Sequence, residues 1–336
     1  MISDSQQMLS ELSDSISSAP PAIATQGLER RYGKTIALAP TTLSIPQGSI
    51  FALLGHNGAG KTTLLKLLVN ILRPSSGTAT VLGRPSTSID GDDFLSIGYV
   101  SENQDLPDWM TVRDFLDYQA GFYPQWNDAA LIQRFDLPMN RKLKHLSRGQ
   151  RMKAALASVL AFSPSLIVLD EPFSGLDPLV RDELIEALLD AVAMKSAAGD
   201  APSTILLSSH DLAEIESFCT HVAFLHGGHL LFAEELPHLA ARFREVTVTF
   251  GSAANLETNT VVVPPASWLN LQLSGHTARF VHARADVEAV GDQVRAFYSG
   301  VIDIDQEPMT LRSIFLAVAK SGRDLKRADG VEGGRQ

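Results

Sequence analysis

The sequence has little cysteine and no long apolar run. Its single cysteine, Cys219, cannot form a disulfide within the chain, which indicates a reducing compartment. No apolar stretch approaches the roughly 18 residues that a membrane span needs. Met1 to Pro21 is rich in serine and lacks a basic start, so we expect a disordered lead-in and neither a signal peptide nor an anchor. Any membrane role is therefore expected to go through a partner chain.

Basic residues are also in deficit. The 336 residues include 28 Lys and Arg against 38 Asp and Glu, which gives a net charge of -10. A general nucleic-acid binder would be basic, so the composition argues against nucleic acid as a partner. The hydrophobic fraction of 45% is ordinary for a globular protein, and the length fits one large domain plus a small one.

The strongest chemical signal is a glycine-rich stretch, called the phosphate loop below. Its residues are Gly55, His56, Asn57, Gly58, Ala59, Gly60, Lys61, Thr62 and Thr63. It fits G-x-x-x-x-G-K-[ST] and lies between a strand-like run at 50–54 and a helical pattern at 64–71. Its glycines let backbone N–H groups surround an anion, and the helix dipole adds to the attraction. We expect Lys61 on the β- and γ-phosphates and Thr62 on Mg²⁺, so the stretch predicts a nucleotide site.

Adjacent carboxylates follow the most apolar strand pattern. The run at 166–169 reads as a strand buried on both faces of a parallel sheet, and it ends in Asp170 and Glu171. Open α/β sheets place ligands at this end of their strands. Asp170 suits Mg²⁺ held through water, and Glu171 suits a water that it orients and polarises for attack. Another apolar strand, at 204–207, leads to His210, which could reach the γ-phosphate.

The remaining segments before about residue 237 alternate between strand and helix patterns. Strands are expected at 23–28, 41–45, 78–82 and 97–100, and a Gly-Gly hairpin is expected to join 222–225 to 230–232. Helices are expected over much of 108–144 and over 151–162. Asp177 and Pro178 suit the N-cap and first position of a further helix.

The tail at 244–320 reads as a separate small α+β unit. Apolar residues alternate at 246–250 and at 269–273, as in half-buried strands. They recur at helical spacing at 287–297, and Thr310 can cap a last helix. The polar segment 321–336 is expected to be disordered.

Taken together, these motifs resemble the ATP-binding cassette (ABC) superfamily. The phosphate loop, a signature at 146–150, the strand with its carboxylates, a loop at 174–177 and His210 occur in the family's order. The signature resembles the family's L-S-G-G-Q, with Arg148 as its third residue. The resemblance covers about residues 22–237. It implies an α/β P-loop NTPase fold with a mixed sheet core, an antiparallel β subdomain and a helical subdomain at about 102–162, and the tail resembles, more loosely, the C-terminal extension of bacterial export-type subunits.

The resemblance also implies roles for single residues. The family has a glutamine after the strand that ends at Val100, and this chain has Glu102 there, with Gln104 two residues on. A glutamate can also ligate Mg²⁺. The implied catalytic residues are Glu171 and the switch histidine His210. The implied nucleotide contacts are Tyr32, which would stack on the base, the phosphate loop, Ser147, Gly149, Gln150 and Asp177. The implied metal ligands are Thr62, Asp170 and Glu102.

The resemblance therefore implies an ATP-hydrolysing transporter subunit, with ATP and Mg²⁺ as cofactors. In the family each ATP lies between the phosphate loop of one cassette and the signature of another, so a second cassette is expected, and a homodimer is the simplest form. A separate transmembrane permease would insert a short helix at 102–145. The chain would then work in the cytoplasm, peripheral to the cell membrane, and the tail favours export.

Other ABC functions remain alternatives. A translation factor of the family carries two cassettes in one chain, and this chain has one. Chromosome-organising and repair ATPases insert a long coiled coil, whereas about 85 residues without sustained heptads separate Lys61 from Ser147. A regulatory cassette that binds ATP only as a switch is favoured by Glu102 and opposed by the intact catalytic residues.

Overall fold

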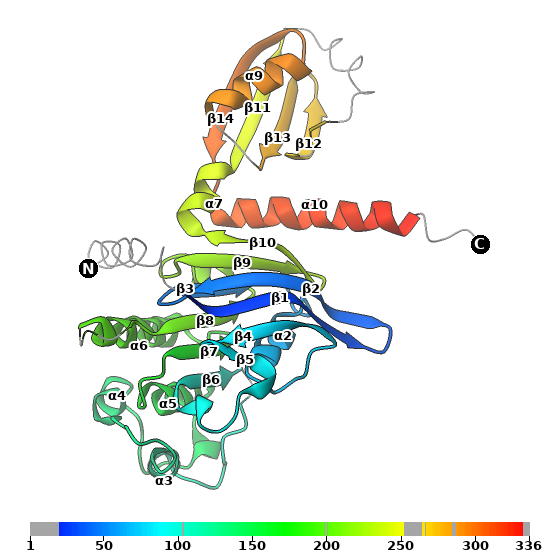
Figure 1. The fold of residues 1–336 in the computed structure, drawn as a ribbon. Coiled ribbons are helices and arrows are strands. Elements are labelled where there is room, and N and C mark those ends of the chain that lie inside the picture. Colours follow the sequence, from blue (N-terminus) through cyan, green and yellow to red (C-terminus); the bar gives the residue numbers. More distant parts are fainter. Residues whose placement is uncertain are drawn as a thin grey trace. The chain divides into compact units, whose positions relative to one another are not determined.

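The protein was examined as a computed structural model, which describes residues 20–102, 104–197, 199, 201–251, 264–265, 267–283 and 287–331. The expected lead-in before residue 20 lies outside the described residues. The chain divides into two compact units, Met1–Ala233 and Glu234–Gln336, which are described in turn (Figure 1).

An antiparallel sheet begins the first unit. Its strands are β1 (Pro21–Tyr32), β2 (Thr35–Pro46), β4 (Ser76–Val81) and β5 (Arg84–Pro85), in the order β2-β1-β4-β5. β1 and β2 are longer than the runs expected from sequence, because pairing continues to Tyr32 and Thr35 at the hairpin tip. The tip therefore carries Tyr32.

A six-stranded sheet forms the core of this unit, in the order β10-β9-β3-β8-β7-β6. Its strands are β3 (Ile50–Leu54), β6 (Ile97–Ser101), β7 (Leu166–Asp170), β8 (Thr204–Ser209), β9 (His221–His226) and β10 (His229–Glu235). β6, β7, β8, β3 and β9 pair in parallel, and every residue of β7 is buried, as the sequence predicted. The Gly-Gly turn between β9 and β10 is also confirmed. The parallel pairing brings the carboxyl ends of β3, β7 and β8 to one edge.

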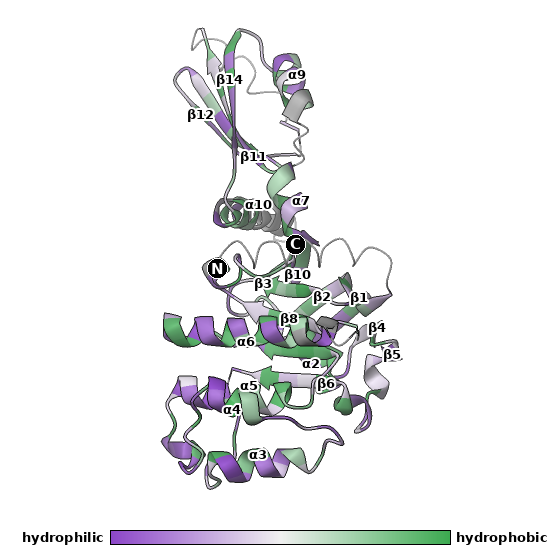
Figure 2. Cartoon of the chain, turned by 90° about the vertical axis from the view of Figure 1, so that its left-hand side faces the viewer, coloured by the Kyte–Doolittle hydropathy of each residue, from purple (hydrophilic) through white to green (hydrophobic). Residues whose placement is uncertain are grey.

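Helices complete the unit, and hydrophilic and hydrophobic residues alternate along α3 and α6 (Figure 2). They are α2 (Lys61–Leu68), α3 (Val112–Ala120), α4 (Ala129–Arg134), α5 (Arg148–Leu160) and α6 (Pro178–Ala197). Short 3₁₀ turns lie at Ser86–Ser88, Asp93–Leu95, Leu143–His145 and Leu212–Glu214. The segment 108–144 is less helical than expected: α3 stops before Pro124 and α4 before Pro138, since proline cannot continue a helix. No helix in the described ranges is long and apolar enough to cross a membrane.

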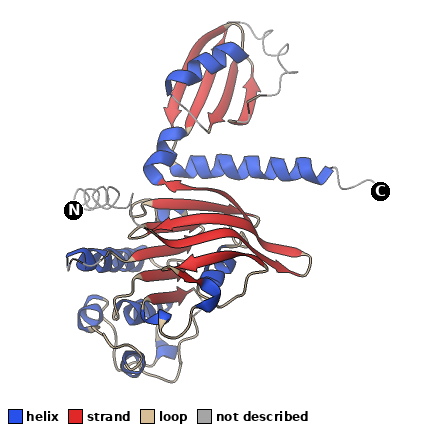
Figure 3. Cartoon of the chain, in the orientation of Figure 1, coloured by secondary structure: helices blue, strands red, loops and turns tan. Residues whose placement is uncertain are grey.

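The second unit is a small α+β fold. α7 (Leu236–Arg242) opens it, and its antiparallel sheet has the order β12-β13-β11-β14. The strands are β11 (Arg244–Phe250), β12 (Trp268–Ser274), β13 (Thr277–His282) and β14 (Val301–Pro308). α9 (Val287–Phe297) crosses one face of the sheet, and its Val290 and Val294 join a buried cluster with Val246, Val248 and Trp268 (Figure 3). α10 (Leu311–Val331) ends the described chain.

Two features of the second unit depart from the sequence patterns. The leucine alternation at 269–273 marks the buried face only in part, because Leu271 packs against the buried cluster whereas Leu273 is 43% exposed and Trp268 is 5% exposed. The pairing register shifts between Leu269 and Gln272, which breaks the period of two. α10 also continues through residues 321–331, which were expected to be disordered, and this segment has no proline to interrupt the helix. Residues 332–336 lie outside the described residues.

Candidate active site

The phosphate loop links β3 to α2, and close backbone approaches require its glycines. A Cβ atom at Gly55 would lie 2.4 Å from the Leu225 carbonyl oxygen, and one at Gly60 would lie 2.7 Å from the Ala37 carbonyl oxygen. Gly60 is also the N-cap of α2, with a left-handed φ of 104°. α2 begins at Lys61, so the free N–H groups of its first turn adjoin the loop. The strand–loop–helix context expected from sequence is present.

The Lys61 side chain is almost fully buried inside the loop. Its Nζ donates to the carbonyl oxygens of Gly55, at 2.6 Å, and His56, at 3.3 Å. Nζ also lies 3.0 Å from Glu171 Oε1, in an ion pair whose side chains are 5% and 9% exposed. A buried ammonium without a partner would cost several kcal/mol. The carboxylate at the end of β7 therefore stabilises the lysine of the phosphate loop.

Asp170 is a buried carboxylate held by hydroxyl groups. Thr62 Oγ1 donates to its Oδ1 at 3.0 Å, and Ser208 Oγ donates to the same atom at 2.7 Å. Burial and the charge of Asp170 raise the pKa of Tyr99, on the neighbouring strand β6, to about 12. The Tyr99 phenol is therefore neutral at physiological pH, and Asp170 provides the negative charge on this side of the site.

Glu171 connects the lysine to the histidine. His210 Nδ1 donates to Glu171 Oε2 at 2.7 Å, while Oε1 faces Lys61. The Glu171 backbone has a φ of 52°, in the left-handed region that residues other than glycine rarely adopt. Such a conformation costs on the order of 1 kcal/mol, and it persists mostly at functional sites. The turn after β7 therefore holds this carboxylate between Lys61 and His210.

Ser208 also belongs to the site, although no motif in the sequence singles it out. It is the fifth residue of β8 and is fully buried. Its hydroxyl donates to Asp170 and accepts the backbone N–H of Glu171 at 2.9 Å. The signal available in the sequence was a serine that follows the apolar run Ile205–Leu207, near the end of a strand next to β7. Ser208 therefore fixes both carboxylates with one hydroxyl.

Replacing Ser208 with alanine is expected to lower ATP turnover about tenfold, an effect of about 1.4 kcal/mol on the barrier. The change removes a bond to Asp170 and leaves the buried Glu171 N–H unpaired, which costs about 1–3 kcal/mol. Steady-state hydrolysis and thermal unfolding would be measured together. Ser209→Ala is the control, because Ser209 Oγ is bonded to Asp211 and Glu214 instead. Equal losses of turnover in both variants would contradict the role of Ser208.

Tyr32 lies at the end of β1 with its side chain partly exposed. The residue is 48% exposed, and the guanidinium carbon of Arg30 lies 4.5 Å from its ring centre. The neighbouring strand β2 borders the phosphate loop, since the Ala37 carbonyl meets Gly60. A ring that is half exposed and supported by a cation can stack on a further planar group. Base stacking by Tyr32 remains a prediction.

The signature forms the start of α5. Ser147 is its N-cap: Gln150 N donates to Ser147 Oγ at 3.2 Å, and Ser147 N donates to Gln150 Oε1 at 3.1 Å. This capping box starts the helix at Arg148, earlier than the expected start at Arg151, and the pattern S-x-x-Q could have revealed it. A Cβ atom at Gly149 would lie 3.1 Å from a methyl group of Val180, so little space is left there.

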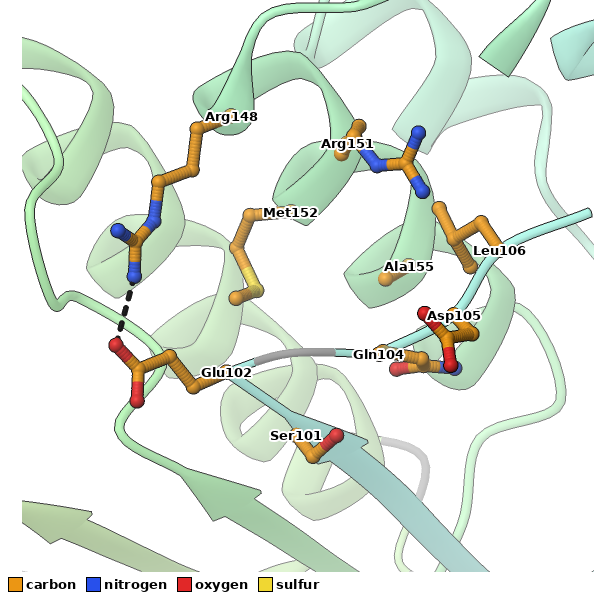
Figure 4. A pocket seen from close by; sticks show the side chains of 9 residues that line it. All are labelled: Ser101, Glu102, Gln104, Asp105, Leu106, Arg148, Arg151, Met152 and Ala155. Atoms are coloured by element: carbon orange, nitrogen blue, oxygen red, sulfur yellow. Dashed lines mark hydrogen bonds and ion pairs between the residues drawn. The ribbon is translucent and has the colours of Figure 1, made fainter. Parts of the chain in front are cut away.

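The other predicted residues form a second group around the signature. Asp177 accepts the N–H of Leu179 at 2.9 Å, which confirms it as the cap of α6. Glu102 pairs with Arg148 at 2.8 Å beside a pocket of about 400 Å³ (Figure 4). Among the described residues, no hydrogen bond or ion pair joins this group to the phosphate loop. Direct contacts thus bring Lys61, Thr62, Asp170, Glu171 and His210 together, and among the described residues no such contact links Glu102, Ser147, Gln150 or Asp177 to them.

The first group suits a nucleotide with Mg²⁺. Thr62 and Asp170 place a hydroxyl and a carboxylate oxygen 3.0 Å apart, and such oxygens are the donors that Mg²⁺ prefers. A bound Mg²⁺ would neutralise charge on phosphate oxygens. The described residues contain no cluster of three or more His, Cys, Asp and Glu that could hold a metal by themselves.

Known proteins share this architecture. The family profile described as ABC transporter matches residues 38–174. The chain is 36% identical to an ABC transporter ATP-binding protein of Nostoc sp. (strain PCC 7120) over 66% of this chain and 68% of that protein. It is 30% identical to the Nod factor export ATP-binding protein I of Rhizobium leguminosarum bv. viciae, over 94% and 99%. A solved ATP-binding subunit of an ABC transporter matches with a TM-score of 0.59 and 26% identity, over 66% of this chain and 92% of that one.

These matches confirm the family and the α/β P-loop fold predicted from sequence. The relative from Rhizobium extends the likeness over almost the whole chain, and the solved structure covers the cassette. Together with the site geometry, they show that the chain belongs to the ATP-binding proteins of ABC transporters.

Proposed function

We propose that this protein hydrolyses ATP to drive export through a separate transmembrane permease. The observation that carries the proposal is the connected cluster of Lys61, Glu171 and His210, next to Thr62 and Asp170. It unites a cation for phosphates, oxygen donors for Mg²⁺ and a carboxylate for an attacking water. The bond between His210 and Glu171 favours turnover over a regulatory cassette that only binds ATP, because Lys61 engages only one of the two Glu171 oxygens.

Each residue has a distinct task in this proposal. The phosphate loop and Lys61 bind the β- and γ-phosphates, and Tyr32 stacks on the base. Thr62 and Asp170 hold Mg²⁺. Glu171 orients and polarises the attacking water, and His210, already bonded to Glu171, contacts the γ-phosphate.

A second cassette, most simply another copy of this chain, would complete the site. Ser147 is exposed at the N-terminus of α5, and helix N-termini attract anions. Among the described residues it has no bond to its own phosphate loop, so it is available to the ATP of a partner. Ser147, Gly149, Gln150 and Asp177 would then contact the nucleotide held by the other copy, and hydrolysis would release the dimer.

The permease is expected to dock on the helical segment 102–145. Trp109, Tyr118 and Phe122 expose 71%, 55% and 58% of their surface there, and large exposed apolar side chains favour a protein partner. Export is supported by the likeness to the Nod factor export protein, which extends over the second unit. The chain would act at the cytoplasmic face of the membrane, with the cassette at 22–237 and the C-terminal domain at 244–320.

Light scattering after size exclusion tests this mechanism on Glu171→Gln, with and without Mg-ATP. We expect monomers without nucleotide and dimers with ATP, because the amide retains binding and slows hydrolysis. Lys61→Ala in the same background is the control, and it should stay monomeric. A monomer that demonstrably binds ATP would overturn the homodimer and require a different cassette or the permease.

A further inference from the structure

Arg148 makes contacts that reach well beyond the signature. Its Nη2 donates to Glu102 Oε1 at 2.8 Å, and Figure 4 shows the guanidinium directed at that carboxylate along one side of the pocket. Glu102 follows Ser101, the residue of β6 that pairs with Asp170 of β7. One side chain from the start of α5 therefore reaches the segment beside the metal-site carboxylate.

The same guanidinium also lies against Gly175, in the loop at 174–177. A Cβ atom at Gly175 would lie 3.0 Å from Arg148 Nη1 and 3.4 Å from its central carbon, and Gly175 has a left-handed φ of 65°. This loop follows Glu171 and ends at Asp177, the cap of α6. Arg148 thus contacts both segments that leave the catalytic strands β6 and β7.

The charges around Arg148 leave Glu102 as its ion-pair partner. The next basic residue on α5, Arg151, pairs with Asp108 and donates to the Leu143 carbonyl. The Arg148 and Glu102 side chains are 50% and 33% exposed, so water and salt weaken their attraction. A pair of this kind contributes little to global stability, but it can hold exposed loops in register.

We propose that Arg148 is a positioning residue, which ties the signature to the loops after β6 and β7 through Glu102 and Gly175. This proposal rests on the proposed function, in which Ser147 and Gly149 meet the ATP of a second cassette. The tie would keep the signature in a fixed position relative to Asp170 and Glu171 of its own chain. Its loss would weaken ATP-driven pairing and leave the affinity of the single cassette for ATP unchanged.

Hydrogen–deuterium exchange on the free protein tests the tie directly. Arg148→Gln is expected to speed exchange about two- to fivefold in peptides that contain Glu102 and Gly175, because both residues lose a contact. Arg151→Gln is the matched control, since it removes an ion pair from the same helix without reaching Gly175. Unchanged exchange in both segments of Arg148→Gln would overturn the proposal, whether or not the protein dimerises.

A double-mutant cycle tests the consequence for pairing, in the Glu171→Gln background. Glu102→Gln and Arg148→Gln are each expected to raise the ATP concentration for half-maximal dimerisation about two- to fivefold. The double variant should need no higher an ATP concentration than the more affected of the two single variants. The difference should shrink at high salt, and Arg148→Lys should restore part of it. Additive effects would overturn the pairing with Glu102. Failure of the Glu171→Gln parent to dimerise would count against the proposed function. The hydrogen–deuterium exchange experiment would still test the contacts of Arg148 with Glu102 and Gly175.

Discussion

Lys61→Ala is expected to weaken ATP binding at least 100-fold and to abolish turnover. The ammonium lies inside the phosphate loop, between the Gly55 carbonyl and Glu171, where a phosphate would meet it. Its removal takes away the charge that would pair with the phosphates. It also leaves Glu171 buried without its partner, and breaking a buried pair of this kind lowers the free energy of unfolding by about 3–5 kcal/mol. Titration with a fluorescent ATP analogue measures the affinity.

Lys66→Ala is the control for this prediction. Lys66 lies in the last turn of the same short helix, so its loss changes the net charge equally and leaves the first turn intact. We expect nearly normal ATP binding. Tight binding by Lys61→Ala would contradict the phosphate role, and equal weakening in both variants would indicate a general effect of charge.

Glu171→Gln is expected to keep ATP binding and to lower turnover by about three orders of magnitude, within the range that general base catalysis contributes. The amide has nearly the shape of the carboxylate and lacks its negative charge and basicity. Single-turnover hydrolysis separates the chemical step from product release. A loss of less than tenfold would show that Glu171 does not activate the water.

Glu214→Gln is a matched control for Glu171→Gln. Glu214 accepts a hydrogen bond from Ser209, next to His210 in sequence, so the change removes a carboxylate from the same neighbourhood. Burial raises the pKa of Glu214, so the folded state binds its proton more tightly than the unfolded state does. Ionised Glu214 therefore destabilises the fold as the pH rises through this pKa, and the neutral amide should not lower stability at neutral pH. We expect turnover within a few-fold of the parent.

The sequence predicted most of what depends on local pattern. β3, β7 and the Gly-Gly turn could be predicted because unbroken apolar runs are typical of strands buried on both faces, and glycine pairs are typical of two-residue hairpin turns. The phosphate loop and the carboxylates were readable because such chemistry requires fixed residue types at fixed spacing. The ends of β3 and β7 meet at one sheet edge, which follows from parallel pairing alone.

Contacts between distant segments could not be predicted in the same way. Ser208 acts through its place opposite Asp170, and Arg148 through its distance from Glu102 and Gly175. Neither contact produces a periodic pattern or a fixed residue spacing that could be recognised in the sequence. The start of α5 differs, because the Ser147–Gln150 capping box is a local pattern and marks it in the sequence. In β12 the register shift between Leu269 and Gln272 interrupts the alternation, so that Trp268 is buried and Leu273 is exposed, and no local pattern signals such a shift.

The backbone at Glu171 has a consequence for how this family can diverge. Glycine or asparagine adopts a left-handed φ more readily than glutamate does, so the backbone conformation alone would favour either at position 171. The buried ion pair with Lys61 opposes that exchange, because it would leave the ammonium without its carboxylate. A descendant that loses this glutamate is therefore expected to change Lys61 as well, so that the base and the phosphate-binding lysine disappear together.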